Sequence, residues 1–314
     1  MELLRLRVVH VVGARPNLMK AAAVIKHRPD DLVIHTGQHW DLGTLDGFRP
    51  DINLDCRTSN LPDLLQALTG EFQQTNPGKV VVYGDVNSTL AAALAAAHLN
   101  IPVAHVEAGL RSGDMSMPEE VNRLAVDAVS TEWFTTEPEA VANLAGKGQF
   151  VGNPMIDTLK AAGVERSSGG PVIVTLHRPG NVDNPERAGR IVAAINEIAG
   201  EFSTLVVRHP RAAHLQFKCD TVDALPYREF IEMVAAAPFV VTDSGGVQEE
   251  TTWLDVPCFT LRPNTERPVT VTLGSNRLVE PEDLPAAVAR DWPTRRAIPP
   301  LWDGHAGERI AACL

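Results

Sequence analysis

The sequence predicts an α/β protein built from doubly wound parallel sheets. Short apolar runs rich in Val and Ile recur along the chain, and they are continuous rather than alternating, which is typical of strands buried on both faces of a parallel sheet. Alanine-rich stretches with helical spacing lie between the runs, for example at 88–100 and 186–200. This alternation favours open sheets covered by helices. The expected strands are 8–13, 32–37, 79–84, 101–106, 172–177, 204–209, 239–244 and 257–261.

The regular pattern is interrupted between Gly152 and Pro171, where one candidate helix precedes a Ser-Gly-Gly-Pro break. The chain has 314 residues, which is enough for two domains of roughly 150 residues each. We therefore expect a domain boundary in the interval 152–170. The sequence contains no internal repeat and no low-complexity tract.

Composition excludes several classes of partner. The formal net charge of −11 argues against nucleic acid and anionic membranes. The four cysteines are scattered without a CxxC pair, which indicates neither a zinc site nor a disulfide framework. The first apolar run is short and carries arginines, as a first strand would rather than a signal peptide. No segment approaches the ~20 apolar residues of a membrane span, so we expect a soluble cytoplasmic protein.

Polar motifs follow seven of the expected strands at their carboxyl ends. In open α/β sheets, ligands bind outside that edge. Because the motifs come from both halves of the chain, we expect two sheets that face each other across a ligand-binding cleft. The motifs are GARP (13–16), GQH (37–39), GD (84–85), HVE (105–107), LHRPGN (176–181), RHPR (208–211) and DSGG (243–246).

The segment DSGGVQEE (243–250) follows an expected strand and precedes a helix. Ser244, Gly245 and Gly246 would bring backbone N–H groups against a phosphate at the helix N-terminus, and glycine permits the close approach. The carboxylate of Glu250 would accept hydrogen bonds from a ribose diol. The alternative is that Ser244 only caps the helix.

Acidic residues gather at strand ends in the first half of the chain. Asp85 either caps a helix or projects into the cleft. Glu107 follows a strongly apolar strand and would be costly to bury without partners. Pro118 fits the first position of a helix. Glu119 and Arg123 then lie one turn apart, and the alternative to a functional role is that they only pair with each other.

Basic residues near the same edges suit an anionic ligand. His177 and Arg178 follow one expected strand and would contact a diphosphate, and Arg15 and Lys20 follow the first strand and would neutralise negative charge from the other side. The alternative is that Arg15 and Lys20 are surface charges and that His177 is structural.

The motifs taken together resemble the non-hydrolysing UDP-N-acetylglucosamine 2-epimerases. The resemblance extends from about residue 8 to WDGHAGERI (302–310). It implies the two-domain GT-B fold, with a last helix that returns to the first domain. We expect domain one at 1–152 plus 298–314 and domain two at 153–297. The matching segments are GARPNLMK, GQH, YGDVNSTLAAALAA, HVEAGLRSGD, MPEEVNR, VGNPMIDTL, VTLHRPGNVDNPER, TDSGGVQEE and NTERPVTVTLGSNRLV.

The resemblance also implies roles for individual residues. Asp85, Glu107 and Glu119 match the catalytic acids of the family, and His177 matches an active-site contact that we group with them. Phe230 matches an aromatic position that packs on uracil. The chain departs from typical members at Asn17, where they carry an acid, and in being shorter. The expected ligand contacts are Arg15, Lys20, Gln38, Arg111, Arg123, His209, Phe230, Ser244, Gly245, Gly246 and Glu250.

The implied reaction interconverts UDP-N-acetylglucosamine and UDP-N-acetylmannosamine at C2, by elimination of UDP, a 2-acetamidoglucal intermediate and re-addition. We expect no cofactor, no metal site and a homodimer, and a place in polysaccharide or glycoconjugate biosynthesis. Three alternatives stay open: a GT-B glycosyltransferase that uses a UDP-sugar, a hydrolysing 2-epimerase that releases UDP and N-acetylmannosamine, and a non-catalytic nucleotide-sugar sensor.

Overall fold

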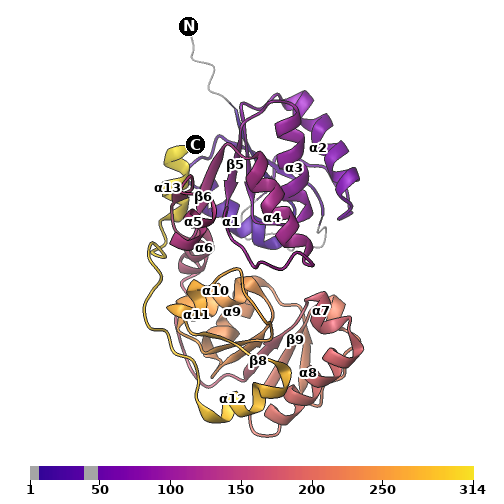
Figure 1. Cartoon of the computed structure of the whole chain (residues 1–314), viewed down its shortest axis with the longest axis vertical. Helices are drawn as coiled ribbons and strands as arrows, with labels where there is room; N and C mark the ends of the chain where they lie inside the picture. The colour runs from indigo at the N-terminus through magenta and orange to yellow at the C-terminus, as the bar shows by residue number, and fades with distance from the viewer. Residues whose placement is uncertain (1–6, 39–48) are drawn as a thin grey trace. The chain divides into compact units, whose positions relative to one another are not determined.

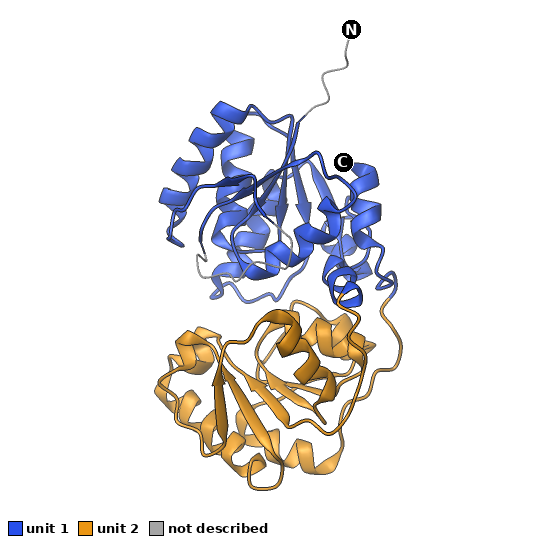
Figure 2. Cartoon of the chain, turned by 180° about the vertical axis from the view of Figure 1, so that it is seen from behind, with its two compact units in different colours: residues 1–161, 300–314 blue, residues 162–299 orange. Residues whose placement is uncertain are grey.

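Two compact units make up the chain (Figure 2). The computed structural model describes residues 7–38 and 49–314. Unit 1 comprises residues 1–161 and 300–314, and unit 2 comprises residues 162–299. Each unit has its own parallel sheet with helices packed against it (Figure 1). No helix in the described part of the chain is long and apolar enough to cross a membrane.

Unit 1 has seven strands in its described residues, in the order β3-β2-β1-β4-β5-β6-β7, and all neighbouring pairs are parallel. The strands are β1 (Val8–Val12), β2 (Leu32–His35), β3 (Ile52–Asn53), β4 (Lys79–Tyr83), β5 (Val103–Val106), β6 (Glu132–Thr135) and β7 (Gln149–Phe150). The helices are α1 (Arg15–Ile25), α2 (Leu61–Thr75), α3 (Asn87–His98), α4 (Pro118–Val129), α5 (Pro138–Asn143), α6 (Pro154–Ala161) and α13 (Ala306–Cys313).

Unit 2 has a six-stranded parallel sheet in the order β10-β9-β8-β11-β12-β13. The strands are β8 (Val172–Thr175), β9 (Thr204–Arg208), β10 (Asp220–Asp223), β11 (Val240–Thr242), β12 (Cys258–Thr260) and β13 (Asn276–Leu278). The helices are α7 (Pro179–Val182), α8 (Pro185–Ile198), η1 (Pro210–Ala212), α9 (Tyr227–Ala236), α10 (Gly245–Leu254), α11 (Val269–Thr272), η2 (Pro281–Asp283) and α12 (Leu284–Arg290).

Each sheet reverses its winding direction once. In unit 1 the chain runs from β1 outward through β2 to β3 and then starts again at β4 on the other side of β1. In unit 2 it runs from β8 through β9 to β10 and starts again at β11. The loops that leave the two central strands diverge at such a point, and they open a crevice at the carboxyl edge of the sheet. The motifs GARP and GD leave β1 and β4, and LHRPGN and DSGG leave β8 and β11.

The two faces of the unit 1 sheet are covered differently. The alanine-rich stretch forms α3, whose buried alanines let the helix lie close to the sheet and leave room for Leu64, Leu68 and Phe72 of α2. On the other face, Leu18 and Val24 of α1 and Ile310 of α13 share a core with strand residues. Burial on both faces explains why the central strands are continuous apolar runs.

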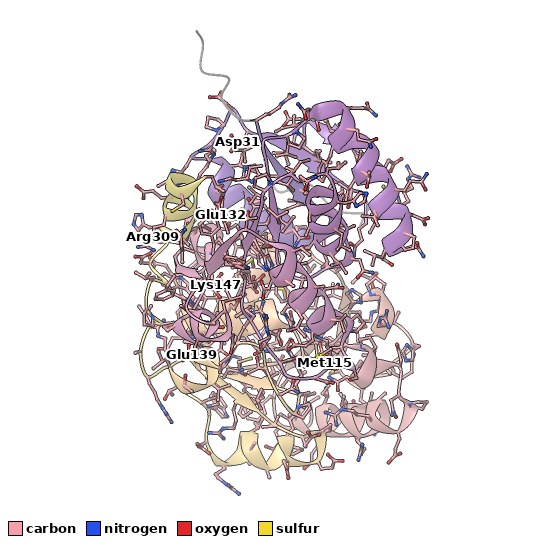
Figure 3. All side chains as sticks on the ribbon, turned by 45° about the horizontal axis from the view of Figure 1, so that its top comes forward. Asp31, Met115, Glu132, Glu139, Lys147 and Arg309 are labelled. Carbon is pink, nitrogen blue, oxygen red and sulfur yellow. The ribbon has the colours of Figure 1, made fainter. Side chains whose placement is uncertain are left out.

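The end of the chain is fastened to unit 1 by specific contacts. The buried carboxylate of Asp157 in α6 accepts hydrogen bonds from the backbone N–H groups of Ala306 (3.1 Å) and Gly307 (2.7 Å), so it satisfies the first turn of α13. Arg309 of α13, labelled in Figure 3, donates to the carbonyl of Val151 (3.0 Å). Because α6 packs against α1 and α13, it belongs to unit 1.

All eight runs that the sequence analysis expected to be strands contain strands. Residues 7–38 and 49–314 contain five further strands that were not predicted: β3, β6, β7, β10 and β13. They lie toward the sheet edges, and most of them include polar residues, so they lack the continuous apolar signal.

Gly307 tests the docking of α13 on α1. A Cβ at Gly307 would lie 2.0 Å from the carbonyl oxygen of Ala23, whereas a Cβ at Gly70 in α2 would have nothing within 4 Å. We expect Gly70→Ala to raise the free energy of unfolding by about 0.5–1 kcal/mol, because alanine favours helix. Gly307→Ala should instead lower it by about 1–3 kcal/mol, because the helices must separate. Equilibrium unfolding in urea measures both, and equal stabilisation by the two variants would contradict this packing.

Candidate functional site

Glu107 leaves the end of β5 in a conformation that few residues adopt. Its φ is +73°, and its backbone N–H donates to the carbonyl of Phe134 (2.9 Å). The carboxylate is buried and forms an ion pair with the buried ammonium group of Lys20 from α1. A non-glycine residue held at positive φ costs stability and is over-represented at functional sites. The structure thus brings together two residues that the sequence analysis assigned to the site.

Gly84 makes room for this ion pair. Its φ is +64°, and a Cβ there would lie 2.9 Å from Oε2 of Glu107 and 3.4 Å from Nζ of Lys20. Any larger residue would press on the Glu107 carboxylate as well as strain the turn. Glycine is therefore required for both backbone conformation and space.

Asn17, the departure from typical family members, has a local explanation. Its Nδ2 donates to the carbonyl of Tyr83 (2.8 Å), and its Oδ1 accepts from the backbone N–H of Ala14 (3.1 Å). A carboxylate has no proton to donate when ionised, so an amide is the group that serves both contacts. Asn17 thereby links the start of α1 to the end of β4.

Asp85 is held from α4. Its carboxylate accepts from Nε of Arg123 (3.0 Å) and lies 2.8 Å from Nη2 of the same guanidinium group, and its carbonyl accepts from Nδ2 of Asn122 (2.8 Å). The residue at the N-cap of α3 is Val86, so the alternative that Asp85 caps this helix is wrong. Asp85 remains partly exposed, which suits a group that contacts a ligand.

The sequence analysis assigned no role to Glu120, which is the buried acid of α4. Its carboxylate accepts from the backbone N–H groups of Ser112 (2.9 Å) and Gly113 (3.0 Å) and forms an ion pair with Arg123. Burial by itself would raise the pKa of Glu120, but these hydrogen bonds and the Arg123 charge outweigh it and lower the pKa. Glu120 stays ionised and fastens the preceding loop to α4, whereas Glu119 beside it is only partly buried.

Three more predicted contacts lie in unit 1. Arg15 is the first residue of α1 and is partly buried. Oε1 of Gln38 accepts from the backbone N–H (2.8 Å) and hydroxyl (2.7 Å) of Ser88. His39, the last residue of the GQH motif, lies outside the described residues. Arg111 forms an ion pair with Asp127 (2.7 Å).

In unit 2, Asp243 organises the loop that carries His177. This carboxylate is fully buried at the end of β11. It accepts from the backbone N–H groups of His177 and Arg178 (3.0 Å each) and from Nδ2 of Asn181 (3.0 Å), and it lies 3.2 Å from Nδ1 of His177. Burial would raise the pKa of Asp243, but the bonds from His177, Arg178 and Asn181 outweigh it, so the pKa is lowered.

The imidazole of His177 is oriented by Asp243 and remains open to solvent. Its side chain is 35% exposed, and its ring centroid lies 5.6 Å from that of His209. His209 also accepts from the backbone N–H of Arg211 (3.2 Å). The structure therefore places these two predicted residues side by side at the carboxyl ends of β8 and β9.

The residues of the predicted anion site lie at the N-terminus of α10. The helix begins at Gly245, and Ser244 occupies the N-cap without a side-chain capping hydrogen bond. Ser244 is thus the N-cap residue of α10 as the alternative expected, although its hydroxyl makes no capping hydrogen bond. Gly246 is partly exposed, and Glu250 is buried one turn further along. Phe230 lies on α9, half-buried.

Three arginines, of which the sequence analysis assigned only Arg178, surround Glu266 beside this helix end. Nη2 of Arg262 lies 2.6 Å and Nη2 of Arg178 lies 3.6 Å from its oxygens, and Arg267 bonds both Glu266 and Glu249. A Cβ at Gly245 would lie 2.5 Å from Nη1 of Arg267. The guanidinium groups thus add positive charge to a helix N-terminus, which favours an anion. Arg267 lies in the NTERP segment (264–268), which could have pointed to it, and Arg262 precedes that segment by two residues.

No group of three or more His, Cys, Asp or Glu side chains in the described part of the chain is arranged to hold a metal ion.

Comparison with known proteins identifies the family. The family model for UDP-N-acetylglucosamine 2-epimerase matches residues 23–314. The chain belongs to this family. The enzyme class that the sequence predicted, an isomerase, is confirmed with it.

Relatives match over nearly the whole chain. The UDP-N-acetylglucosamine 2-epimerase of Methanocaldococcus jannaschii is 36% identical over 361 residues, covering 97% of each chain. A UDP-2,3-diacetamido-2,3-dideoxy-D-glucuronate 2-epimerase of Pseudomonas aeruginosa is 35% identical over 312 residues, covering 87% of this chain and 88% of that protein.

Solved structures agree with these relatives. The crystal structure of the Methanocaldococcus jannaschii UDP-GlcNAc 2-epimerase in complex with UDP-GlcNAc and UDP has a TM-score of 0.87 at 34% identity, covering 98% of this chain and 99% of that one. This likeness confirms the predicted GT-B type α/β fold.

Substitution of Gly84 tests the role of Glu107, and substitution of Gly146 is the control for backbone strain. Gly146 also has positive φ (+82°), but a Cβ there would have nothing within 4 Å. We expect Gly84→Ala and Gly146→Ala each to lose about 1 kcal/mol of stability, because both place a Cβ in the left-handed region. Only Gly84→Ala should also lose epimerase turnover, by about 10²-fold, because it displaces the carboxylate. Turnover assays and urea unfolding check this, and equal turnover in the two variants would remove Glu107 from the site.

Asp243→Asn should destabilise the chain by about 3 kcal/mol or more at neutral pH, because it leaves buried donors without a charged acceptor. Asp223→Asn is the control: that carboxylate is 88% exposed and pairs with Arg208, so its loss should cost less than about 1 kcal/mol.

The pH dependence of the same variant follows from the lowered pKa of Asp243. A carboxylate with a lowered pKa stabilises the fold above its ordinary value of about 3.9, and this contribution is lost as pH falls through the lowered pKa. The stability difference between wild type and Asp243→Asn should be constant from about pH 8 to 5 and shrink below about pH 4. Unfolding midpoints across this range measure it, and a difference that widened in acid would have the wrong sign.

Proposed function

We propose that the protein interconverts UDP-N-acetylglucosamine and UDP-N-acetylmannosamine at C2 without net hydrolysis. The observation that carries this proposal is the pair of acids at the carboxyl edge of the unit 1 sheet, where Glu107 faces Lys20 and Asp85 faces Arg123. Membership of the epimerase family and the resemblance to an enzyme solved with UDP-GlcNAc and UDP support it.

The chemistry explains why acids are needed. The proton on C2 is not next to a carbonyl, so its direct removal is unfavourable. If the anomeric C–O bond breaks first, UDP departs with the bonding electrons and the C2 proton becomes acidic. Its removal gives a 2-acetamidoglucal. In the return step a diphosphate oxygen attacks C1 while a proton is added to the opposite face of C2, so the reaction is balanced and redox-neutral and needs no cofactor.

The acids of unit 1 would carry the proton transfers. We assign removal and return of the C2 proton to Asp85, Glu107 and Glu119, because transfer on opposite faces calls for separate groups. Lys20 and Arg123 hold the first two in place and, with Arg15, Gln38 and Arg111, would contact the substrate. Preorganised charges of this kind also stabilise the positive charge that develops at C1.

The groups of unit 2 would bind UDP. We assign the diphosphate to His177, Ser244, Gly245 and Gly246, since the N-terminus of α10 and neighbouring arginines favour an anion. His177 would stabilise the departing diphosphate. Glu250 would accept from the ribose, Phe230 would stack on uracil, and His209 would support the His177 ring.

A second substrate is favoured by one observation. The relative from Pseudomonas aeruginosa, at 35% identity, is named for UDP-2,3-diacetamido-2,3-dideoxy-D-glucuronate. That sugar has the same C2 centre but differs at C3 and C6, so the same acids would serve. Comparison of kcat/KM for the two UDP-sugars decides between them, since pocket contacts that fit one substituent discriminate against the other.

NMR of the reaction in D₂O tests the proposal. Incubation with UDP-N-acetylglucosamine should give UDP-N-acetylmannosamine with solvent deuterium at C2, because the removed proton exchanges on the carboxylate before it returns. After many turnovers, full protium at C2 would contradict the elimination mechanism. Free UDP with N-acetylmannosamine would indicate a hydrolysing enzyme, transfer to an acceptor a glycosyltransferase, and binding without conversion a sensor.

A further inference from the structure

His105 is a fully buried histidine in β5 that the proposed reaction does not use. Its ring connects three elements of unit 1. Nε2 lies 2.8 Å from the carbonyl oxygen of Gly84, in the turn after β4, and Nδ1 lies 2.7 Å from Oδ1 of Asp127 on α4. His105 is therefore placed between the helix that carries Arg123 and the turn that carries Asp85.

Both ring nitrogens of His105 face acceptors. A backbone carbonyl can only accept, so Nε2 donates to Gly84. Oδ2 of Asp127 accepts from Arg111 (2.7 Å) and from the backbone N–H of Gly109 (3.1 Å). Burial would raise the pKa of Asp127, but His105 and Arg111 outweigh it and the pKa is lowered. Oδ2 of Asp127 already accepts from two donors, so Oδ1 is the acceptor that faces Nδ1, and all of these contacts are satisfied together when both ring nitrogens of His105 carry a proton.

His105 contacts the peptide that precedes Asp85. The N–H of Gly84 donates to the carbonyl of Val106 (3.0 Å), and its C=O accepts from His105. Both backbone groups of Gly84 are therefore held by β5, the strand that leads into Glu107. Asp85 itself is held by α4, where Asp127 also lies. Movement of the ring would shift Asp85 relative to Glu107.

We propose that His105 is a positioning residue: its imidazolium, anchored by Asp127, holds the Gly84 carbonyl and thereby sets the placement of Asp85 relative to Glu107. The inference rests on the proposed function, since it concerns the two acids assigned to proton transfer. A buried ion pair contributes little net stability compared with an apolar pair. The role of the His105–Asp127 pair is therefore to place Gly84 rather than to stabilise the fold.

Two substitutions of His105 separate its contacts. The amide nitrogen of Gln reaches about as far as Nε2 and can still donate to Gly84, whereas that of Asn reaches about as far as Nδ1 and keeps only Asp127. We expect His105→Asn to lower kcat by about 10²-fold with KM changed less than about 3-fold. His105→Gln should restore kcat to within about 10-fold of wild type.

His10 is the matched control, because it is also fully buried and paired with an aspartate. Its Nε2 lies 3.0 Å from Asp31, and its Nδ1 lies 2.6 Å from the hydroxyl of Tyr83, which can donate. Burial lowers the pKa of His10, so this ring is neutral. His10→Gln should lower stability in urea and leave kcat within about 3-fold of wild type, because no carbonyl of the site depends on it. Equal kcat in folded His105→Asn and His105→Gln would overturn the positioning role.

NMR of isotope-labelled histidine side chains in the wild-type protein tests the charge without any variant. At neutral pH both nitrogens of His105 should carry protons, and one nitrogen of His10 should lack its proton. A neutral His105 ring would overturn the proposal even if the variants failed to fold. If the wild type does not epimerise the UDP-sugar, the proposed function fails. The protonation state of His105 still shows whether its ring donates to the Gly84 carbonyl.

Discussion

Parallel strand pairing is the constraint on which the rest of each unit depends. It brings the carboxyl ends of all strands to one edge, and the reversal of strand order between β1 and β4, and between β8 and β11, makes the central loops diverge there. Polar side chains that would be costly inside the sheet find space and partners at this edge. Glu107 and His177 lie in different units, but both are placed at the carboxyl edge of a sheet by this strand arrangement.

Charges at these edges are buried in groups rather than singly. Glu107 has Lys20, Glu120 has Arg123 and two backbone N–H groups, and Asp243 has His177 with its neighbours. An isolated buried charge would shift its pKa and become neutral, whereas a partnered one stays ionised. Such groups contribute little net stability. Their effect is to hold these side chains in one arrangement, and such preorganisation is what the proposed reaction requires of them.

Much of the architecture could be predicted because it depends on local pattern. Central strands are buried on both faces and must be continuously apolar, so β1, β4, β5 and the corresponding strands of unit 2 were all expected. Strands near the sheet edges need no such run, and the polar segment Asp220–Asp223 gives no strand signal although it forms β10. The order of the motifs along the sequence was enough to predict the family, because the residues of these motifs lie at strand ends, where the chemistry of the site determines them.

The sequence by itself determined the fold class, the family and which strand ends carry acids and bases, since these follow from periodicity and from residue types at fixed positions along the chain. Only the tertiary structure decided the partners. In the structure, Glu120 accepts from the backbone of the loop before α4 and holds that loop in place. Asp243 accepts from the backbone N–H of His177, and the ring of His105 contacts the carbonyl of Gly84. These contacts link residues on different elements, often far apart along the chain, and their geometry depends on how helices pack on a twisted sheet. No local pattern encodes that packing, because it is the sum of many long-range contacts.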